Sequence, residues 1–389
     1  MKKNVFITGS TGFLGGELLV DLSKRSEVGK IYCLVRSSSK SKAVQRLKKV
    51  FDFHGDLFDP DKIIPIQGDL AQEDLTKVLC ENKLLEDVNY IVHSAANTSF
   101  SPIYDKMVVD INIHGLQKIL SWSQKLKHLE TFVYVGTATI CGKEATHRLI
   151  KEDESPNVNT EHIVKYTYTK MQGEIEVAKY LPKEKILIVR PSIILGDSRP
   201  WVPRSYVIMW TLATLNFLRL VPSNGKILLD MVPVDYVSDA IIKLMFAKRK
   251  HSVYHISSGE KAATTSFDIG NTIEKAFPGL PKFNFVGYDM LRDMKLWSKK
   301  RLNKDSKLNN YKEYLDYWNS IMENTGQLRI LMAGLDPYIE FMELGQVFDN
   351  SRLLEEEIGV VQPKPAHQYI KNSIHLLKEI DIFEAALEP

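Results

Sequence analysis

The stretch Val5-Phe6-Ile7-Thr8-Gly9-Ser10-Thr11-Gly12-Phe13-Leu14-Gly15 decides how the chain begins to fold. It opens as a strand, turns through a glycine cluster, and continues into a helical pattern that includes Leu18, Leu19 and Leu22. Glycines allow a tight turn and a close backbone approach, and the amino end of a helix offers N–H groups to a pyrophosphate. A three-glycine pattern alone is weak evidence. The strand–turn–helix context here predicts a dinucleotide-binding loop.

Working outward from this loop, short apolar runs alternate with helix-length amphipathic segments. The runs rich in β-branched and aromatic residues are 5–7, 31–35, 63–66, 90–92, 132–135 and 186–189. Near-continuous apolar strands that alternate with helices indicate a parallel sheet covered on both faces. The sequence therefore predicts an α/β fold with a doubly wound parallel sheet, whose ligand lies beyond the carboxyl ends of the strands.

The alternation breaks down from about Pro191 onward. We expect a dinucleotide-binding domain over 1–196 and a smaller, mostly helical substrate lobe over 197–389, with a strand-like run at 253–256 that returns to the core. A segment rich in lysine and tyrosine, at about 278–336, reads as a helical insertion. It is typical of a solvated helical excursion, with a lid or a docking surface for an acidic partner as the alternative.

Composition excludes several classes of protein. Of 389 residues, 51 are Lys or Arg and 48 are Asp or Glu, so the formal charge is +3, and 44% are apolar. This is the mix of a soluble globular protein, and it argues against a nucleic-acid partner. Three scattered cysteines predict neither a disulfide framework nor a metal site. The apolar stretch 205–222 is too short and interrupted to span a bilayer, so we expect a cytoplasmic protein, with peripheral membrane contact left open.

The glycine spacing differs by one residue from the usual dinucleotide fingerprint. It resembles the short-chain dehydrogenase/reductase superfamily, and the wording Thr-Gly-x-Thr-Gly-Phe-Leu-Gly resembles its extended branch, which has an NAD(P)-binding Rossmann fold. The resemblance implies that Asp69, followed by Leu70, contacts the adenine, and that Ala95 and Ala96 let the cofactor lie against the end of their strand. The loop residues implied to bind the cofactor are Thr8, Gly9, Thr11, Gly12, Phe13, Leu14 and Gly15.

The end of the second strand predicts which cofactor is bound. An acidic residue there would bind the ribose 2′-hydroxyl of NAD, whereas an arginine can hold the 2′-phosphate of NADP. The position is Arg36, followed by three serines, with no acid before Asp52. NADPH is therefore favoured over NADH.

Tyr166 and Lys170 are four residues apart and share a helix face. A tyrosine with an ordinary pKa near 10 is a poor acid–base group at neutral pH, and a nearby ammonium together with a nicotinamide cation is expected to lower that pKa. Hydride transfer to a carbonyl needs a proton donor for the developing oxyanion, which such a tyrosine can supply. The superfamily places its catalytic helix at this point of the chain. Tyr168 is the local competitor, but four residues on it has Gln172 instead of a lysine.

Thr137 takes the role of the superfamily's third catalytic residue by resemblance, hydrogen-bonding the substrate oxygen. Thr139 is the alternative, expected to lie beyond the reacting centre. Pro191 and Ser192, after the sixth strand, resemble the segment that lines the nicotinamide side of the pocket. With Tyr166 and Lys170, they complete the residues expected to contact the cofactor.

Within the superfamily, Leu34-Val35-Arg36 and the run His93-Ser94-Ala95-Ala96-Asn97-Thr98-Ser99-Phe100 look most like the thioester reductases, including the fatty acyl-CoA reductases. This resemblance implies hydride transfer from NADPH to an acyl thioester, on CoA or a carrier protein, to give an aldehyde or an alcohol. The alternatives are a nucleotide-sugar epimerase and a hydroxysteroid or alcohol dehydrogenase of the same fold. A redox-sensing binding protein would not need Tyr166 or Lys170. A homodimer is left open.

Overall fold

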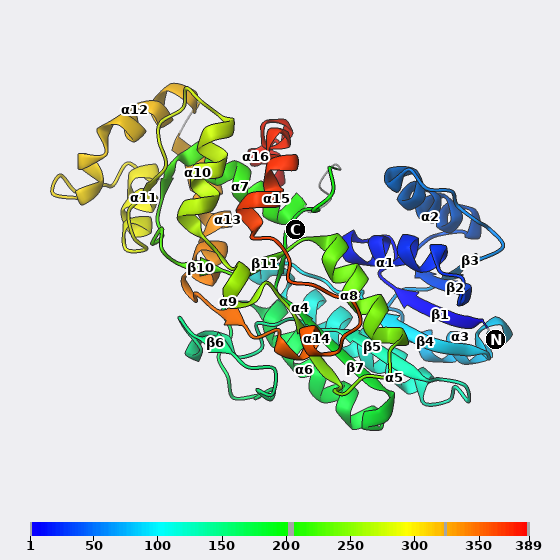
Figure 1. Cartoon of the computed structure of the whole chain (residues 1–389). Helices are drawn as coiled ribbons and strands as arrows, with labels where there is room; N and C mark the ends of the chain where they lie inside the picture. Colours follow the sequence, from blue (N-terminus) through cyan, green and yellow to red (C-terminus); the bar gives the residue numbers. More distant parts are fainter. Residues whose placement is uncertain (1, 201–205, 323–324, 387–389) are drawn as a thin grey trace.

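The computed structural model describes residues 2–200, 206–322 and 325–386 and has the predicted α/β fold (Figure 1). A seven-stranded parallel sheet runs in the order β12-β7-β5-β4-β1-β2-β3. Its strands are β1 (Lys3–Thr8), β2 (Val28–Val35), β3 (Ile63–Gln67), β4 (Val88–His93), β5 (Thr131–Val135), β7 (Ile186–Pro191) and β12 (Val253–Ile256). The strand order reverses between β1 and β4, so this switch point is where a ligand is expected. The predicted doubly wound parallel sheet is confirmed.

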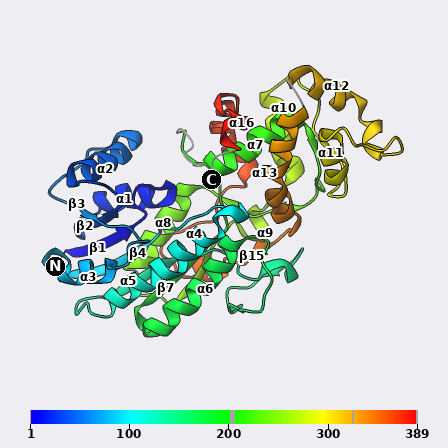
Figure 2. The same ribbon diagram turned by 180° about the vertical axis from the view of Figure 1, so that it is seen from behind.

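Helices cover both faces of the sheet because the strands are apolar on both sides. One apolar core combines the sheet with α1 (Phe13–Lys24), α2 (Lys40–His54) and α8 (Val234–Phe246). A second core lies on the opposite face, beneath α3 (Leu75–Glu81), α5 (Leu116–Ser123) and α6 (Lys165–Tyr180), and Figure 2 shows this face turned toward the viewer. All five residues of β5 are buried.

The later part of the chain forms a mostly helical lobe with a core of its own. Its larger helices are α7 (Tyr206–Leu218), α10 (Ser266–Ala276), α11 (Met290–Ser298), α12 (Lys312–Ile321) and α13 (Thr325–Glu343). The shorter helices, taken over the whole described chain and not the lobe alone, are α4 (Asp105–Val109), α9 (Gly259–Ala262), α14 (Ser351–Glu355), α15 (Ala366–Tyr369) and α16 (Ile382–Ala385). Short paired strands are β6 (Leu149–Ile150), β8 (Ile193–Ile194), β9 (Leu220–Val221), β10 (Leu228–Leu229), β11 (Met231–Val232), β13 (Thr264–Thr265), β14 (Asn284–Phe285) and β15 (Val347–Phe348). The segment 278–336 includes α11 and α12, which bury Met294 and Trp318 in the lobe core.

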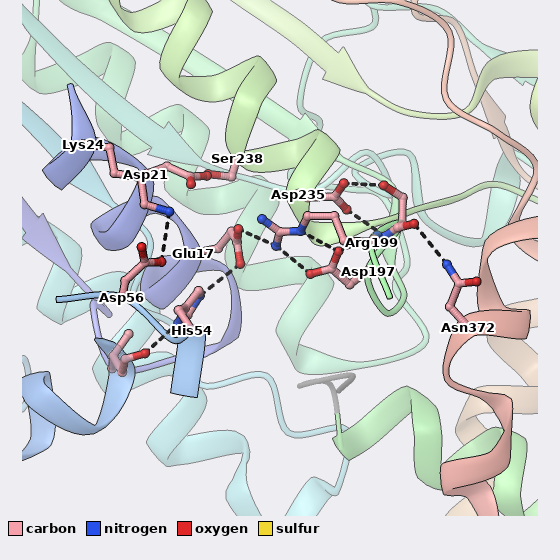
Figure 3. Close-up of polar contacts among 12 residues, drawn as sticks. Glu17, Asp21, Lys24, His54, Asp56, Asp197, Arg199, Asp235, Ser238 and Asn372 are labelled. Carbon is pink, nitrogen blue, oxygen red and sulfur yellow. Dashed lines mark hydrogen bonds and ion pairs between the residues drawn. The ribbon is translucent and has the colours of Figure 1, made fainter. Parts of the chain in front are cut away.

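A buried network of charged groups joins this lobe to the first helix (Figure 3). Glu17 on α1 is fully buried and accepts hydrogen bonds from Arg199 Nη2 at 2.6 Å and from His54 Nε2 at 3.1 Å, the latter when that nitrogen carries the proton. Arg199 also binds the buried carboxylate of Asp197, in the loop that follows β8. The loop entering the lobe is thereby held against α1. Among the described residues, no helix has the length and apolar character needed to cross a membrane.

The glycine loop is packed so closely that side chains are excluded from it. Gly9 has a φ of +76°, and a Cβ atom built on it would lie 2.7 Å from the amide nitrogen of Ala95. A Cβ atom on Gly15 would lie 2.1 Å from the carbonyl oxygen of Gly9, whereas one on Gly12 would lie 3.3 Å from it. The first turn of α1 therefore sits directly on the end of β1, as the sequence pattern predicts.

Substituting Gly15→Ala tests this packing in the absence of any ligand. The added methyl group has backbone on its nearest side, so the free energy of unfolding should fall by about 1–3 kcal/mol, the usual effect of overpacking. The matched control is Gly12→Ala, which should lose less. Urea denaturation of both variants measures the difference, and equal stabilities would contradict the packing described.

Candidate active site

The predicted cofactor loop lies at the switch point between β1 and β4. Thr8 Oγ1 is 3.1 Å from His93 Nδ1 and accepts a hydrogen bond from the Ala95 amide at 3.2 Å, so one buried hydroxyl joins the ends of the two strands. Gly12 is the N-cap of α1, and no described side chain caps the helix there. Uncapped N–H groups at a helix amino end, with glycine backbone beside them, fit a pyrophosphate.

Arg36 and Asp69 extend from the ends of β2 and β3 on the same side of the sheet. Arg36 Nε lies 4.0 Å from Asp69 Oδ2, and the arginine side chain is 73% exposed, so it is accessible to a ligand. Asp69 Oδ1 accepts a hydrogen bond from the Ala71 amide, which fixes the turn after β3. Leu70 is buried, and a Cβ atom on Gly115 would meet its side chain at 2.8 Å.

Arg46 is a candidate cofactor residue that the sequence reasoning missed. It projects from α2, donates from Nη2 to Thr11 Oγ1 at 3.2 Å, and donates from Nη1 to the carbonyl oxygen of Arg36. The Arg46 guanidinium therefore lies beside the glycine loop and joins it to the backbone at the end of β2. The only signal in the sequence was the position of Arg46 beside Leu47 at the edge of the buried face of α2.

Tyr166 and Lys170 both lie on α6, which packs against β5. Lys170 is buried, and its Nζ donates to the carbonyl oxygen of Val135 at 2.6 Å and lies 5.2 Å from the centre of the Tyr134 ring. Burial lowers the pKa of Lys170 to about 8, while the nearby Glu174 raises it. The lysine therefore carries a proton at neutral pH.

The lowering of the Tyr166 pKa that is expected beside a bound nicotinamide cation stays a prediction. Burial raises the pKa of Tyr166 to about 12, because a phenolate would lose its hydration there. The tyrosine is therefore protonated at neutral pH, which is the form a proton donor needs. Tyr168 lies elsewhere on the helix, with its ring 6.0 Å from that of His162 and 5.3 Å from Lys165 Nζ.

Thr137 and Thr139 lie together beyond the end of β5. Both are buried, and their hydroxyl oxygens are 3.0 Å apart. Thr139 also lines a small pocket together with Asp230, Leu229 and Phe341, among others. Pro191 is the last residue of β7 and Ser192 follows it. The Pro191 carbonyl accepts a hydrogen bond from the Ala138 amide at 2.9 Å, and the Ser192 amide donates to the Ile256 carbonyl at 3.1 Å.

Asn112 is a second residue that the sequence reasoning missed. It lies in a π-helical turn (Asp110–Gly115) and is buried. Its Oδ1 accepts from the Asn97 amide at 2.7 Å, and its Nδ2 donates to the Asn97 carbonyl and to Thr169 Oγ1, both at 2.9 Å. Asn112 thus fixes the segment after β4 against α6, beside Lys170. Nothing in its spacing distinguished it from an ordinary helical asparagine.

A wall of half-buried aromatic rings adjoins Tyr166. The ring of Phe100 is 6.3 Å from Tyr166, 4.7 Å from Tyr338 and 5.9 Å from Phe341, centre to centre. Tyr338 and Phe341 lie on α13, so the lobe contributes them. The pocket next to this wall is lined largely by apolar side chains, namely Ile193, Leu228, Leu229, Phe341, Met342, Leu344 and Phe348. Within the apolar stretch 205–222 noted in the sequence, residue 205 lies outside the described residues, while the Trp210 ring is 5.9 Å from that of Tyr338, centre to centre.

Comparison with known proteins places this site in a family. Residues 7–241 match the model of the male sterility protein family of NAD-binding proteins. The chain belongs to that family. Among curated proteins it is 31% identical over 284 residues to CG8306 of Drosophila melanogaster, provisionally named a fatty acyl-CoA reductase, covering 62% of this chain and 54% of that protein. It is 26% identical over 416 residues to fatty acyl-CoA reductase 1 of Homo sapiens, covering 86% of this chain and 79% of that protein.

Solved structures with the same fold include reductase domains and an epimerase. The terminal R domain of the myxalamid biosynthetic pathway superposes with a TM-score of 0.73 and 23% identity, covering 97% of this chain and 91% of that one. UDP-glucuronic acid 4-epimerase from Bacillus cereus, in complex with NAD, superposes with a TM-score of 0.61 and 16% identity, covering 97% and 99%. At these identities the likeness shows the fold alone. From its family and its curated relatives, the chain is an NAD(P)-dependent oxidoreductase of the extended short-chain dehydrogenase/reductase branch.

Proposed function

We propose that the chain reduces an acyl thioester, carried on CoA or on a carrier protein, with NADPH as the hydride donor. The observation that carries this proposal is the aromatic wall of Phe100, Tyr338 and Phe341 beside Tyr166, continued by an apolar pocket. Such a surface stabilises an apolar acyl chain next to the reacting carbonyl. A nucleotide sugar would need polar partners for its hydroxyl groups along this aromatic wall, where the Phe100 and Phe341 rings offer none. The curated relatives named as fatty acyl-CoA reductases support the acyl substrate.

The residues present fit the nicotinamide cofactor, which supplies a hydride when bound. The glycine loop and the uncapped amino end of α1 suit its pyrophosphate, and Asp69 lies where the adenine is expected. Arg36 and Arg46 suit a 2′-phosphate, because two guanidinium groups provide charge-assisted hydrogen bonds. NADPH is therefore the proposed donor, with NADH the weaker ligand.

Side chains of the protein supply the proton and stabilise the charge that develops during the reaction. As hydride reaches the thioester carbon, negative charge develops on its oxygen, and the protonated Tyr166 donates its hydroxyl proton to it. Thr137 hydrogen-bonds the same oxygen, and the Lys170 ammonium favours the phenolate that remains on Tyr166. The resulting hemithioacetal then loses its thiol to give an aldehyde, and a second hydride would give the alcohol. The domain boundary at 196, the homodimer, peripheral membrane contact and a cytoplasmic location stay predictions.

Purified protein should oxidise NADPH when given hexadecanoyl-CoA, and should release free CoA together with aldehyde or alcohol. Mass spectrometry of the products and absorbance of NADPH measure this, with UDP-glucose as the alternative substrate. Consumption of UDP-glucose, with no aldehyde, alcohol or free thiol from acyl-CoA or acyl-carrier thioesters of any chain length, would contradict the proposal.

Tyr166→Phe removes only the proposed proton donor. We expect NADPH to bind normally while kcat falls about 100-fold or more, the usual contribution of a general acid. Tyr168→Phe is the matched control, since it removes a hydroxyl from the same helix and should leave kcat nearly unchanged. Steady-state kinetics with fluorescence titration of NADPH tests this, and the proposed role is lost if the two variants have the same kcat.

Arg46→Ala tests the residue that the sequence reasoning missed. Its Kd for NADPH should rise about tenfold, the equivalent of one charge-assisted hydrogen bond, while the Kd for NADH changes little. Lys48→Ala, which removes a positive charge from an exposed position of the same helix, is the control. Equal weakening of NADPH and NADH by Arg46→Ala would show that Arg46 acts on the fold of the loop instead.

A further inference from the structure

A buried ion pair that the mechanism does not use lies one helical turn beyond Lys170. Glu174 and Arg190 have side chains that are each only 2% exposed. Arg190 Nε donates to Glu174 Oε1 at 2.9 Å, and its Nη2 donates to Oε2 at 2.7 Å. Arg190 also donates from Nη1 to the carbonyl oxygens of Glu152 and Glu154, at 3.4 and 3.1 Å. Removing two ions from water is costly, so a pair this deep is weak evidence for stability alone.

The Glu174–Arg190 pair lies next to the end of β5, where Lys170 of α6 binds the Val135 carbonyl. Lys170 and Glu174 are four residues apart on α6 and therefore share a face. Lys170 Nζ binds the Val135 carbonyl, and a Cβ atom on the next residue, Gly136, would lie 3.0 Å from Glu174 Oε1. The ammonium and the carboxylate therefore meet the backbone at adjacent residues, with no side chain between Glu174 and that backbone.

The helix is held in this register by a second close contact. A Cβ atom on Gly173 would lie 2.0 Å from the Tyr134 hydroxyl oxygen, and that hydroxyl donates to the Lys170 carbonyl at 3.2 Å. Because Tyr134 fills the space beside Gly173, α6 cannot rotate to take Glu174 away from β5 without a clash. These contacts fix Glu174 relative to β5 and to Lys170 on the same helix.

We propose that Glu174, held in place by its bidentate contact with Arg190, is a positioning residue for this reaction, whose carboxylate holds the Lys170 ammonium at the end of β5. This proposal rests on the role given above to Lys170. A correctly placed Lys170 ammonium is required for any hydride transfer at this site, whatever the substrate.

The charged and titratable groups around Lys170 explain why a carboxylate is needed. Tyr166 on α6 and Tyr134 on β5 are neutral, since burial raises the pKa of both. His93 on β4 is also neutral, because burial and then Lys170 lower its pKa to about 3. Arg190 on β7 adds a second positive charge. Burial raises the pKa of Glu174 itself, while the charge and hydrogen bonds of Arg190 and the charge of Lys170 lower it. Paired with Arg190, Glu174 is the one carboxylate among these described neighbours, and it raises the pKa of Lys170, which burial lowers.

The test compares Glu174→Gln with Glu174→Asp, measuring the Kd for NADPH by fluorescence titration from pH 6 to pH 10. In the unmodified chain, affinity should fall as pH rises through the pKa of Lys170, because the ammonium is lost. Glu174→Gln removes the anion and lowers that pKa further, so the fall should move to lower pH by about one unit. Glu174→Asp keeps the charge and should retain the original pH dependence.

A merely structural role for Glu174 would lower the melting temperature and weaken NADPH at every pH equally, and that result would overturn the proposal. If Glu174→Gln does not fold, Gly136→Ala replaces it, since its methyl group pushes the carboxylate away slightly and should cause a smaller shift in the same direction. NADPH binding is measured without a substrate. Failure of the thioester proposal would therefore leave the pH shift intact, and failure of this inference would leave thioester turnover intact.

Discussion

The close approach of three backbone segments at the glycine loop is the constraint on which the rest of the structure depends. Gly9 lies against Ala95 at the end of β4, while Gly15 in α1 lies against the carbonyl of Gly9. Any side chain at these positions would separate β1, α1 and β4, and the amino end of α1 would no longer point at the switch point of the sheet. The buried hydroxyl of Thr8 fixes the same junction with hydrogen-bonding contacts to His93 and Ala95.

The sheet also positions the groups that are proposed to act in catalysis. Helix α6 packs on β5 so that Lys170 reaches the Val135 carbonyl, and the segment after β4 is held to α6 by Asn112. The lobe completes the site from the other side, because α13 places Tyr338 and Phe341 next to Phe100. A protonated Tyr166 therefore lies between a charged lysine and an apolar wall. That arrangement suits the reduction of a carbonyl carried on an apolar chain.

The sequence was enough to predict the parallel sheet, the glycine loop and the Tyr166–Lys170 helix, since these depend on local periodicity and spacing. Contacts between distant segments could not be read in this way. Arg46 reaches Thr11 across 35 residues, and Phe100 meets Tyr338 across more than 200. The spacing reveals a lysine four residues from Tyr166, but it could not reveal the burial that raises the pKa of this tyrosine. The pairing of Glu174 with Arg190 likewise could not be predicted from the sequence, because only the fold brings α6 next to β7.

The most direct measurement of the central claim is the transfer of deuterium from NADPH labelled at the nicotinamide C4 position. After incubation with an acyl-CoA, the account predicts deuterium at C1 of the released aldehyde or alcohol, delivered from one face of the nicotinamide only. It also predicts free CoA equal in amount to the acyl group reduced. Aldehyde or alcohol without the label, or labelled cofactor that remains unchanged while the thioester is merely hydrolysed to acid, would contradict it.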